Sequence, residues 1–69
     1  MINHSTYKPL FSTREAAWAL SVSETTVRRL AKAHFLEQRY IGNRMLITAG
    51  SIEMLVAGLP ALPDPDWWN

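Results

Sequence analysis

The chain of 69 residues contains no cysteine. That absence excludes a disulfide framework, a thiolate zinc site and a cysteine nucleophile. No apolar run approaches the roughly 18 residues that a membrane-spanning helix needs, and the first residues lack the basic and apolar regions of a secretory signal. We therefore expect a cytoplasmic protein without a membrane segment, stabilised by packing alone.

Catalytic and metal-binding patterns are also missing. His4 and His34 fall in different segments, and neither stands at a recognisable spacing from a serine or a carboxylate pair. The sequence has no glycine-rich phosphate loop. A chain this short has room for one small domain and little room for a deep substrate cleft. We expect no enzyme activity, no metal and no cofactor.

Positive charge is concentrated in the middle of the chain. The net charge is only +1, but residues 24–44 hold five basic residues against two acidic ones. Attraction to phosphates acts over about one Debye length, roughly 8–10 Å, so a local cluster matters more than the sum over the whole chain. The distribution favours a polyanionic partner.

Two short helices are expected, joined by a tight turn. Ser12 and Glu15 have the spacing of a capping box, which starts a helix. That helix ends near Leu20, and Ser23 caps a second one within three residues. Two helices joined so closely cross steeply, as in a helix-turn-helix. Ser21 lies in the turn, where a left-handed residue, commonly glycine, is usual.

Each of these helices has one side suited to the core. In the first, the apolar stripe consists of small residues and Leu20, while Trp18 lies on the other side. In the second, Val27, Leu30 and Ala31 cluster together at about 100° per residue. The opposite side is polar and basic. It consists of Thr25, Arg28, Arg29 and Lys32, with Thr26 at its edge.

A β-hairpin and a third helix follow. Gly42 and Asn43 separate two β-prone runs and both tolerate positive φ, which is a two-residue hairpin signal. Arg39 and Arg44 flank the tip. Thr48 is suited to cap the third helix, whose expected core residues are Ile52, Leu55, Val56 and Leu59.

The chain divides into three parts. Residues 1–10 show no periodicity and are expected to fray. Residues 11–59 form the folded domain. Residues 60–69 contain three prolines and two tryptophans, and the prolines favour an extended tail.

The motifs of residues 11–57 resemble the excisionase-type winged helix-turn-helix domain, a branch of the MerR-like DNA-binding fold. The resemblance rests on an E-A-A-x-x-L first helix, a V-S-x-x-T-V-x-R-L turn and second helix, an I-G-x-R wing and a closing helix after I-T. It implies a mainly α fold with a small β-hairpin. Three positions depart from the family pattern: Ser21 replaces a glycine, and Tyr40 and Leu46 replace basic residues of the wing.

The resemblance also implies a function. The second helix would enter the major groove of double-stranded DNA, and the wing would lie along the backbone or in the minor groove. An excisionase, or recombination directionality factor, binds attachment-site DNA in several copies, bends it and directs an integrase toward excision. The alternative within the family is a small transcriptional regulator that occupies a promoter with the same domain.

The expected DNA-binding residues lie on the turn, the second helix and the wing. Arginines of the helix suit guanine edges, while the remaining cations and hydroxyls suit phosphates. The simpler interpretation is a solvated surface, with Arg44 paired to Glu37 across the strands. The set comprises Ser23, Thr25, Thr26, Arg28, Arg29, Lys32, Arg39, Asn43, Arg44 and Arg14.

Three tryptophans are left over: Trp18, Trp67 and Trp68. One interpretation is that the tail packs on the first and third helices and covers Trp18. The other is that these residues contact a second copy of the chain or an integrase, because exposed tryptophan is typical of interfaces. A third class of function follows, a protein-interaction module in which the basic residues are incidental.

Overall fold

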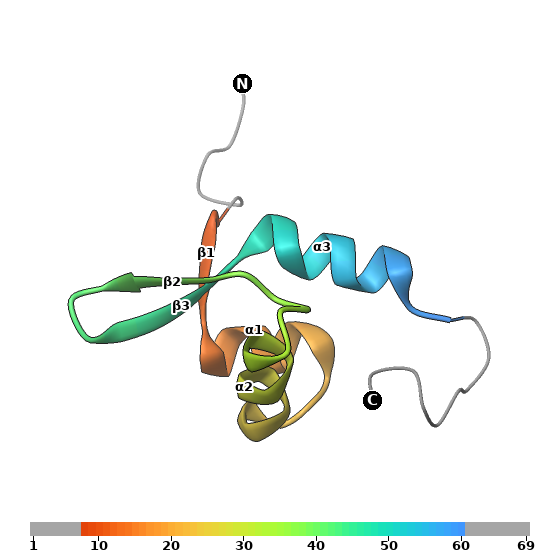
Figure 1. Ribbon diagram of the computed structural model, residues 1–69, viewed down its shortest axis with the longest axis horizontal. Helices are drawn as coiled ribbons and strands as arrows, with labels where there is room; N and C mark the ends of the chain where they lie inside the picture. Colours follow the sequence, from red (N-terminus) through yellow and green to blue (C-terminus); the bar gives the residue numbers. More distant parts are fainter. Residues whose placement is uncertain (1–7, 61–69) are drawn as a thin grey trace.

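The computed structural model of the protein describes residues 8–60 (Figure 1). Three helices and a three-stranded antiparallel sheet form a small mixed α/β fold, with more strand than the expected lone hairpin. In chain order the elements are β1 (Leu10–Ser12), α1 (Thr13–Leu20), α2 (Glu24–Lys32), β2 (Gln38–Ile41), β3 (Arg44–Thr48) and α3 (Ala49–Gly58).

The additional strand is β1. β3 lies in the centre of the sheet, paired antiparallel to β1 on one side and to β2 on the other. Leu10 pairs with Thr48, and the Pro9 carbonyl accepts a hydrogen bond from the Ala49 N–H at 2.9 Å. The expectation that the chain frays as far as Leu10 is therefore wrong for this strand residue. Residues 1–7 lie outside the described part of the chain.

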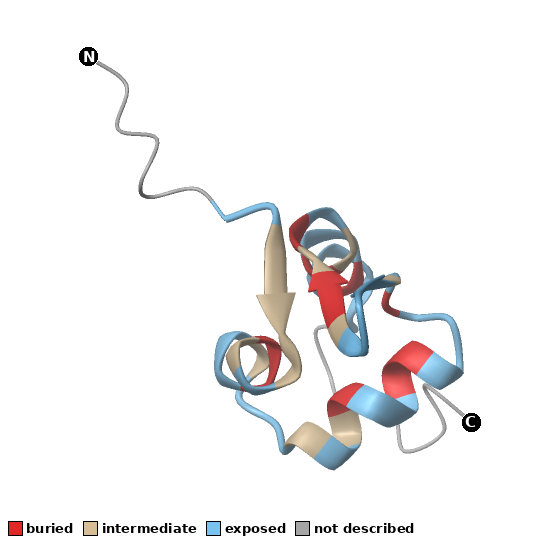
Figure 2. Ribbon diagram, turned by 90° about the vertical axis from the view of Figure 1, so that its left-hand side faces the viewer, coloured by how far each residue is buried: buried red, intermediate tan, exposed pale blue. Residues whose placement is uncertain are grey.

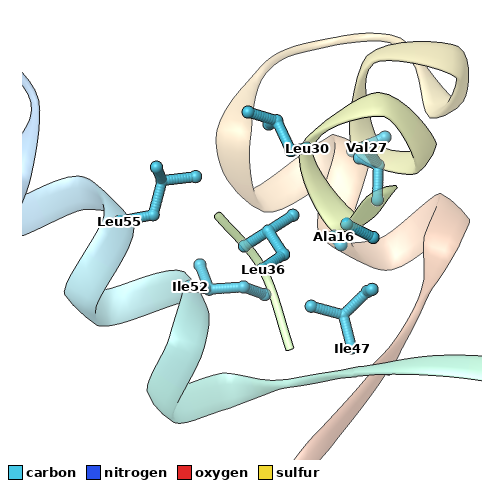
Figure 3. Packing of buried hydrophobic residues seen from close by; sticks show 9 residues of the cluster. Ala16, Val27, Leu30, Leu36, Ile47, Ile52 and Leu55 are labelled. Carbon is cyan, nitrogen blue, oxygen red and sulfur yellow. The ribbon is translucent and has the colours of Figure 1, made fainter. Parts of the chain in front are cut away.

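The core lies where the helices meet the sheet. Ile47 of β3 and Val27 of α2 are the largest fully buried side chains. Figure 3 shows apolar side chains from all three helices and from β3 gathered around Leu36, which comes from the loop before β2. Burying a side chain of this size contributes about 1.5–3 kcal/mol relative to leaving it exposed. A domain this small depends on each of them.

α1 begins at the predicted capping box. The Glu15 N–H donates to Ser12 Oγ at 3.0 Å, and the Ser12 N–H donates to Glu15 Oε1 at 2.9 Å. Lys8 forms an ion pair with the other carboxylate oxygen of Glu15. The hydrogen bond from Lys8, followed by that from the Ser12 backbone, lowers the pKa of Glu15 to about 2. The resulting carboxylate also suits the positive end of the helix.

α3 packs with a narrower stripe than predicted. Ala49, Ile52 and Leu55, spaced three residues apart, are buried. Val56 and Leu59 were expected in the core, but 51% and 45% of their surface is exposed. Val56 is exposed because only one row of α3 side chains meets the core, and the neighbouring positions turn toward solvent. Leu59 follows the last helical residue, Gly58, and has an extended backbone. Figure 2 shows buried and exposed positions side by side along the helices.

Candidate nucleic-acid interface

α2 separates an apolar side from a basic side, as predicted. Val27, Leu30 and Ala31 are buried. Arg29 and Lys32 are exposed, and within residues 8–60 neither has an ion-pair partner. Both cations are therefore accessible to an anion. The exposed residues of this side are Thr25, Arg28, Arg29 and Lys32, and Thr26 at its edge is half-buried.

The turn before α2 is a Schellman motif. Ser21 takes the left-handed conformation, with φ 59° and ψ 42°. The Val22 N–H donates to the Ala17 carbonyl at 3.0 Å, and the Ser21 N–H donates to the Trp18 carbonyl at 3.2 Å. The expected left-handed residue in the turn is confirmed, and a serine occupies it. The turn reverses the chain so that Ser23 starts α2.

α2 ends in a second Schellman motif. His34 has φ 68°. Its N–H donates to the Ala31 carbonyl at 3.1 Å, and the Phe35 N–H donates to the Leu30 carbonyl at 2.8 Å. The sequence does not reveal this motif, because its usual signal is glycine or asparagine at the left-handed position. The turn leads directly to buried Leu36.

The hydroxyls of Ser23 and Thr26 cap α2. Ser23 Oγ accepts a hydrogen bond from the Thr26 N–H at 3.1 Å and lies 3.0 Å from Thr26 Oγ1. Both expected contact residues are thus engaged in holding the start of the helix. Thr25 is exposed, and its hydroxyl has no such partner within residues 8–60. The Thr25 hydroxyl is therefore available to an external hydrogen-bond partner.

Glu24 joins the two helices and approaches Arg28. Its Oε1 accepts a hydrogen bond from Thr13 Oγ1 at 3.2 Å and lies 3.5 Å from Arg28 Nη2. The ion pair is largely solvent-exposed, so it contributes little to stability. Its main effect is to cancel part of the positive charge of the basic side. Sequence reasoning missed the contact with Thr13 because the two residues are eleven positions apart.

The two arginines of the hairpin have different surroundings. Arg39 pairs with Leu46 across the strands, and its guanidinium binds the carboxylate of Glu37. Arg44 pairs with Ile41 in the ladder and has no ion-pair partner within residues 8–60. The alternative in which Arg44 pairs with Glu37 is therefore wrong. Of the two guanidinium groups, that of Arg44 is the more accessible.

The predicted two-residue loop at the hairpin tip is confirmed. Gly42 has φ 60°, whereas Asn43 does not take a positive φ. A positive φ at the first loop residue alone is the pattern of a type II′ turn, whereas a type I′ turn has positive φ at both. Figure 1 shows the tip extending away from the three helices.

Hydrogen bonds join Glu37, just before β2, to Thr48 at the start of α3. The Thr48 N–H donates to the Glu37 carbonyl at 3.1 Å, and Thr48 Oγ1 donates to Glu37 Oε1 at 3.2 Å. The same hydroxyl oxygen accepts from the Ser51 N–H at 3.3 Å, which confirms the predicted N-cap. Glu37 therefore connects Arg39 of the hairpin to the first turn of α3.

Trp18 stands apart from the basic side of α2. Its surface is 86% exposed. The interpretation in which the tail covers Trp18 stays a prediction, because residues 61–69 lie outside the described part of the chain. Arg14 is exposed beside it and has no ion-pair partner within residues 8–60. Trp67 and Trp68 lie outside the described residues. The tryptophan forms part of an open groove of about 410 Å³ lined by Phe11, Arg14, Glu15, Trp18 and Ala19.

Two further kinds of site have no candidate in the described part of the chain. No group of three histidine or acidic side chains there is arranged to hold a metal ion. None of the helices of residues 8–60 has the length and apolar character needed to cross a bilayer.

No known protein family matches the chain, and no curated protein sequence matches it. The motifs of the sequence and the geometry of α2 and the hairpin therefore remain as the indications of function.

Proposed function

We propose that the protein is a sequence-specific DNA-binding protein of the winged helix-turn-helix type, with α2 as its recognition helix and the β2–β3 hairpin as its wing. The observation that carries the proposal is the exposed pair Arg29 and Lys32. Both lie on a helix whose opposite side is locked into the core by Val27 and Leu30. The position of these cations is therefore determined by packing.

The dimensions and chemistry of α2 suit the major groove. An α-helix with its side chains is about 10–12 Å in diameter, and the major groove is about 12 Å wide. Arg29 would read a guanine edge through two hydrogen bonds, and Lys32 would neutralise a phosphate. Arg28 and Thr25 would contact the backbone on either side. Ser23 and Thr26 support the proposal indirectly, by holding the start of α2.

The wing would add a second contact. Arg44, at the end of β3 next to the tip, would reach the backbone or the minor groove, with Asn43 beside it. Arg39 would contribute after leaving Glu37. This arrangement makes the helix the main source of specificity, because the wing carries only two cations.

In this role the protein would act as an excisionase. Several copies would bind side by side on attachment-site DNA, bend it and direct an integrase toward excision. Bending a short site costs about 1–6 kcal/mol, and added contacts have to offset that cost. The alternative, a small transcriptional regulator, uses the same interface and differs only in its target site.

One observation favours a second candidate, a protein-interaction module. Trp18 is 86% exposed beside an open groove, and exposed tryptophan is frequent at protein interfaces. This surface is separate from the basic side of α2. It would serve an integrase, or a second copy of the chain, alongside DNA binding.

The test is selection of a preferred site from a pool of random duplexes, followed by footprinting and titration at several salt concentrations. We expect a preferred sequence, a steep loss of affinity with salt, and cooperative filling when the site is lengthened. Occupancy without sequence preference, or no binding at moderate salt, would contradict the proposal and favour the protein-interaction module.

A further inference from the structure

Two bulky apolar side chains are exposed on the hairpin. Tyr40 is 61% and Ile41 65% exposed. Ile41 is the last residue of β2, next to the Gly42–Asn43 loop, on the part of the molecule that extends away from the helices (Figure 1). An isoleucine at the end of a projecting hairpin contributes nothing to the core. Its side chain is accessible to a ligand.

The two side chains lie on opposite faces of the hairpin. Successive residues of a strand alternate between faces. Ile47 is buried in the core, so Met45 and its cross-strand partner Tyr40 share the core side. Met45 packs against the core cluster, and Tyr40 lies opposite it in the ladder.

Ile41 shares the other face with two cations. It pairs directly with Arg44, and Arg39 precedes it by two residues on the same strand. An apolar side chain is thus flanked by two guanidinium groups near the tip of a narrow two-stranded ribbon. Arg44 has no ion-pair partner within residues 8–60, whereas Arg39 binds the carboxylate of Glu37, which a phosphate would have to displace. Charge complementarity selects a ligand that presents anions on both sides of an apolar surface. The minor groove of a duplex does so, because two phosphate backbones border the sugars and bases.

Resting on the DNA-binding function proposed above, we propose that Ile41 is an apolar wedge that enters the minor groove and opens a base step, while Arg39 and Arg44 hold the two backbones. Side chains of this kind unstack neighbouring bases and kink the duplex by about 20–90°. The wing would then supply the bend, and α2 would supply the sequence preference. The site on DNA would favour a flexible pyrimidine–purine step under the wing.

The variant that tests the wedge is Ile41→Thr. Threonine keeps the branched Cβ and the strand preference of isoleucine but has a polar hydroxyl. Val56→Thr is the matched control, since Val56 is an exposed branched residue on α3, outside the hairpin. Ile41→Leu retains an apolar side chain and distinguishes loss of the wedge from damage to the strand. Circular dichroism establishes that all three fold.

The measurement is energy transfer between dyes at the two ends of a duplex that carries the selected site, together with affinity from anisotropy. We expect Ile41→Thr to lose most of the bend and about tenfold in affinity, with the base preference assigned to α2 unchanged. Ile41→Leu and Val56→Thr should bend DNA as the wild type does.

Two results would overturn the wedge and leave the DNA-binding function intact. One is wild-type bending and affinity for Ile41→Thr. The other is unchanged DNA binding combined with loss of self-association in sedimentation, which would make Ile41 a protein contact. A wild-type protein that binds no duplex at all would overturn both proposals together.

Discussion

The Thr13 hydroxyl donates a hydrogen bond to Glu24 Oε1 across the turn between α1 and α2, at 3.2 Å. The same oxygen lies 3.5 Å from Arg28 Nη2. One carboxylate therefore connects the first turns of two helices and faces a cation of the proposed interface. A phosphate that approaches Arg28 has to compete with Glu24.

Replacing that carboxylate should strengthen DNA binding. Glu24→Gln keeps an acceptor for Thr13 and removes the negative charge beside Arg28. We expect affinity at low salt to rise by about two- to fivefold, a factor that matches the small energy of an exposed ion pair. Fluorescence anisotropy with a labelled duplex measures the change. Glu53→Gln, at an exposed position of α3, is the control. An equal gain in DNA affinity in both variants would contradict a local effect of Glu24.

Arg29 and Lys32 should differ in what their loss does. Arg29→Ala should abolish discrimination at one base position, at a cost of about 1–3 kcal/mol for the preferred base. Lys32→Ala should weaken binding to all sequences alike and lower the salt slope by about one. Titrations of single-base variants of the selected site at several salt concentrations separate the two. An Arg29→Ala variant with near-normal affinity and unchanged preference would refute its assignment.

The two Schellman motifs should each tolerate glycine. Ser21→Gly and His34→Gly relieve a left-handed conformation that costs a residue with a Cβ about 1–2 kcal/mol, and part of this gain is lost to the entropy of glycine. We expect the free energy of unfolding to rise by up to about 1 kcal/mol in each variant, as measured by urea denaturation. Ala19→Gly in helical α1 should lower it by a similar amount. Lower stability in both left-handed variants would contradict the expectation.

The contacts of Glu15 should make stability depend on acidic pH. Hydrogen bonds from Lys8 and from the Ser12 backbone hold the pKa of Glu15 at about 2 in the folded protein, below its ordinary value of 4.5. The folded state therefore gains stability from this carboxylate above about pH 4.5 and loses it as the pH falls toward 2.

The comparison of two variants isolates this contribution. Urea denaturation across that pH window should show a smaller decline for Glu15→Gln than for the wild type. Glu53→Gln should decline as the wild type does. An NMR titration that placed the Glu15 pKa at its ordinary value would rule out the mechanism, because the two states would then bind protons alike.

The helix starts and the two sides of α2 were predictable because they are encoded locally. A cap needs a hydroxyl and an amide three residues apart, as at Ser12, Ser23 and Thr48. The burial of Val27 and the exposure of Arg29 follow from helical periodicity within nine residues.

The features that could not be predicted from the sequence depend on how separate elements come together in the fold. Leu10 is in a strand only because it pairs with Thr48 of β3. A strand of three residues is too short to show the alternation of apolar and polar residues that predicts a strand. Val56 is exposed because the rest of the molecule meets α3 along one row of side chains. Glu37 pairs with Arg39 instead of Arg44 because the strand register places Glu37 beside Thr48 and Arg44 opposite Ile41, at the other end of the hairpin.

Ser12 and Thr48 each end a strand and cap the helix that follows, so the chain passes from strand to helix at both places without a linker. Neither junction contains a loop residue that could absorb a change in chain length. One inserted residue would rotate the following helix by about 100° and turn its apolar stripe away from the core. We therefore expect changes in chain length between residues 10 and 58 to be tolerated in the turns at 21–23, 33–37 and 42–43, which border the two surfaces proposed to contact DNA.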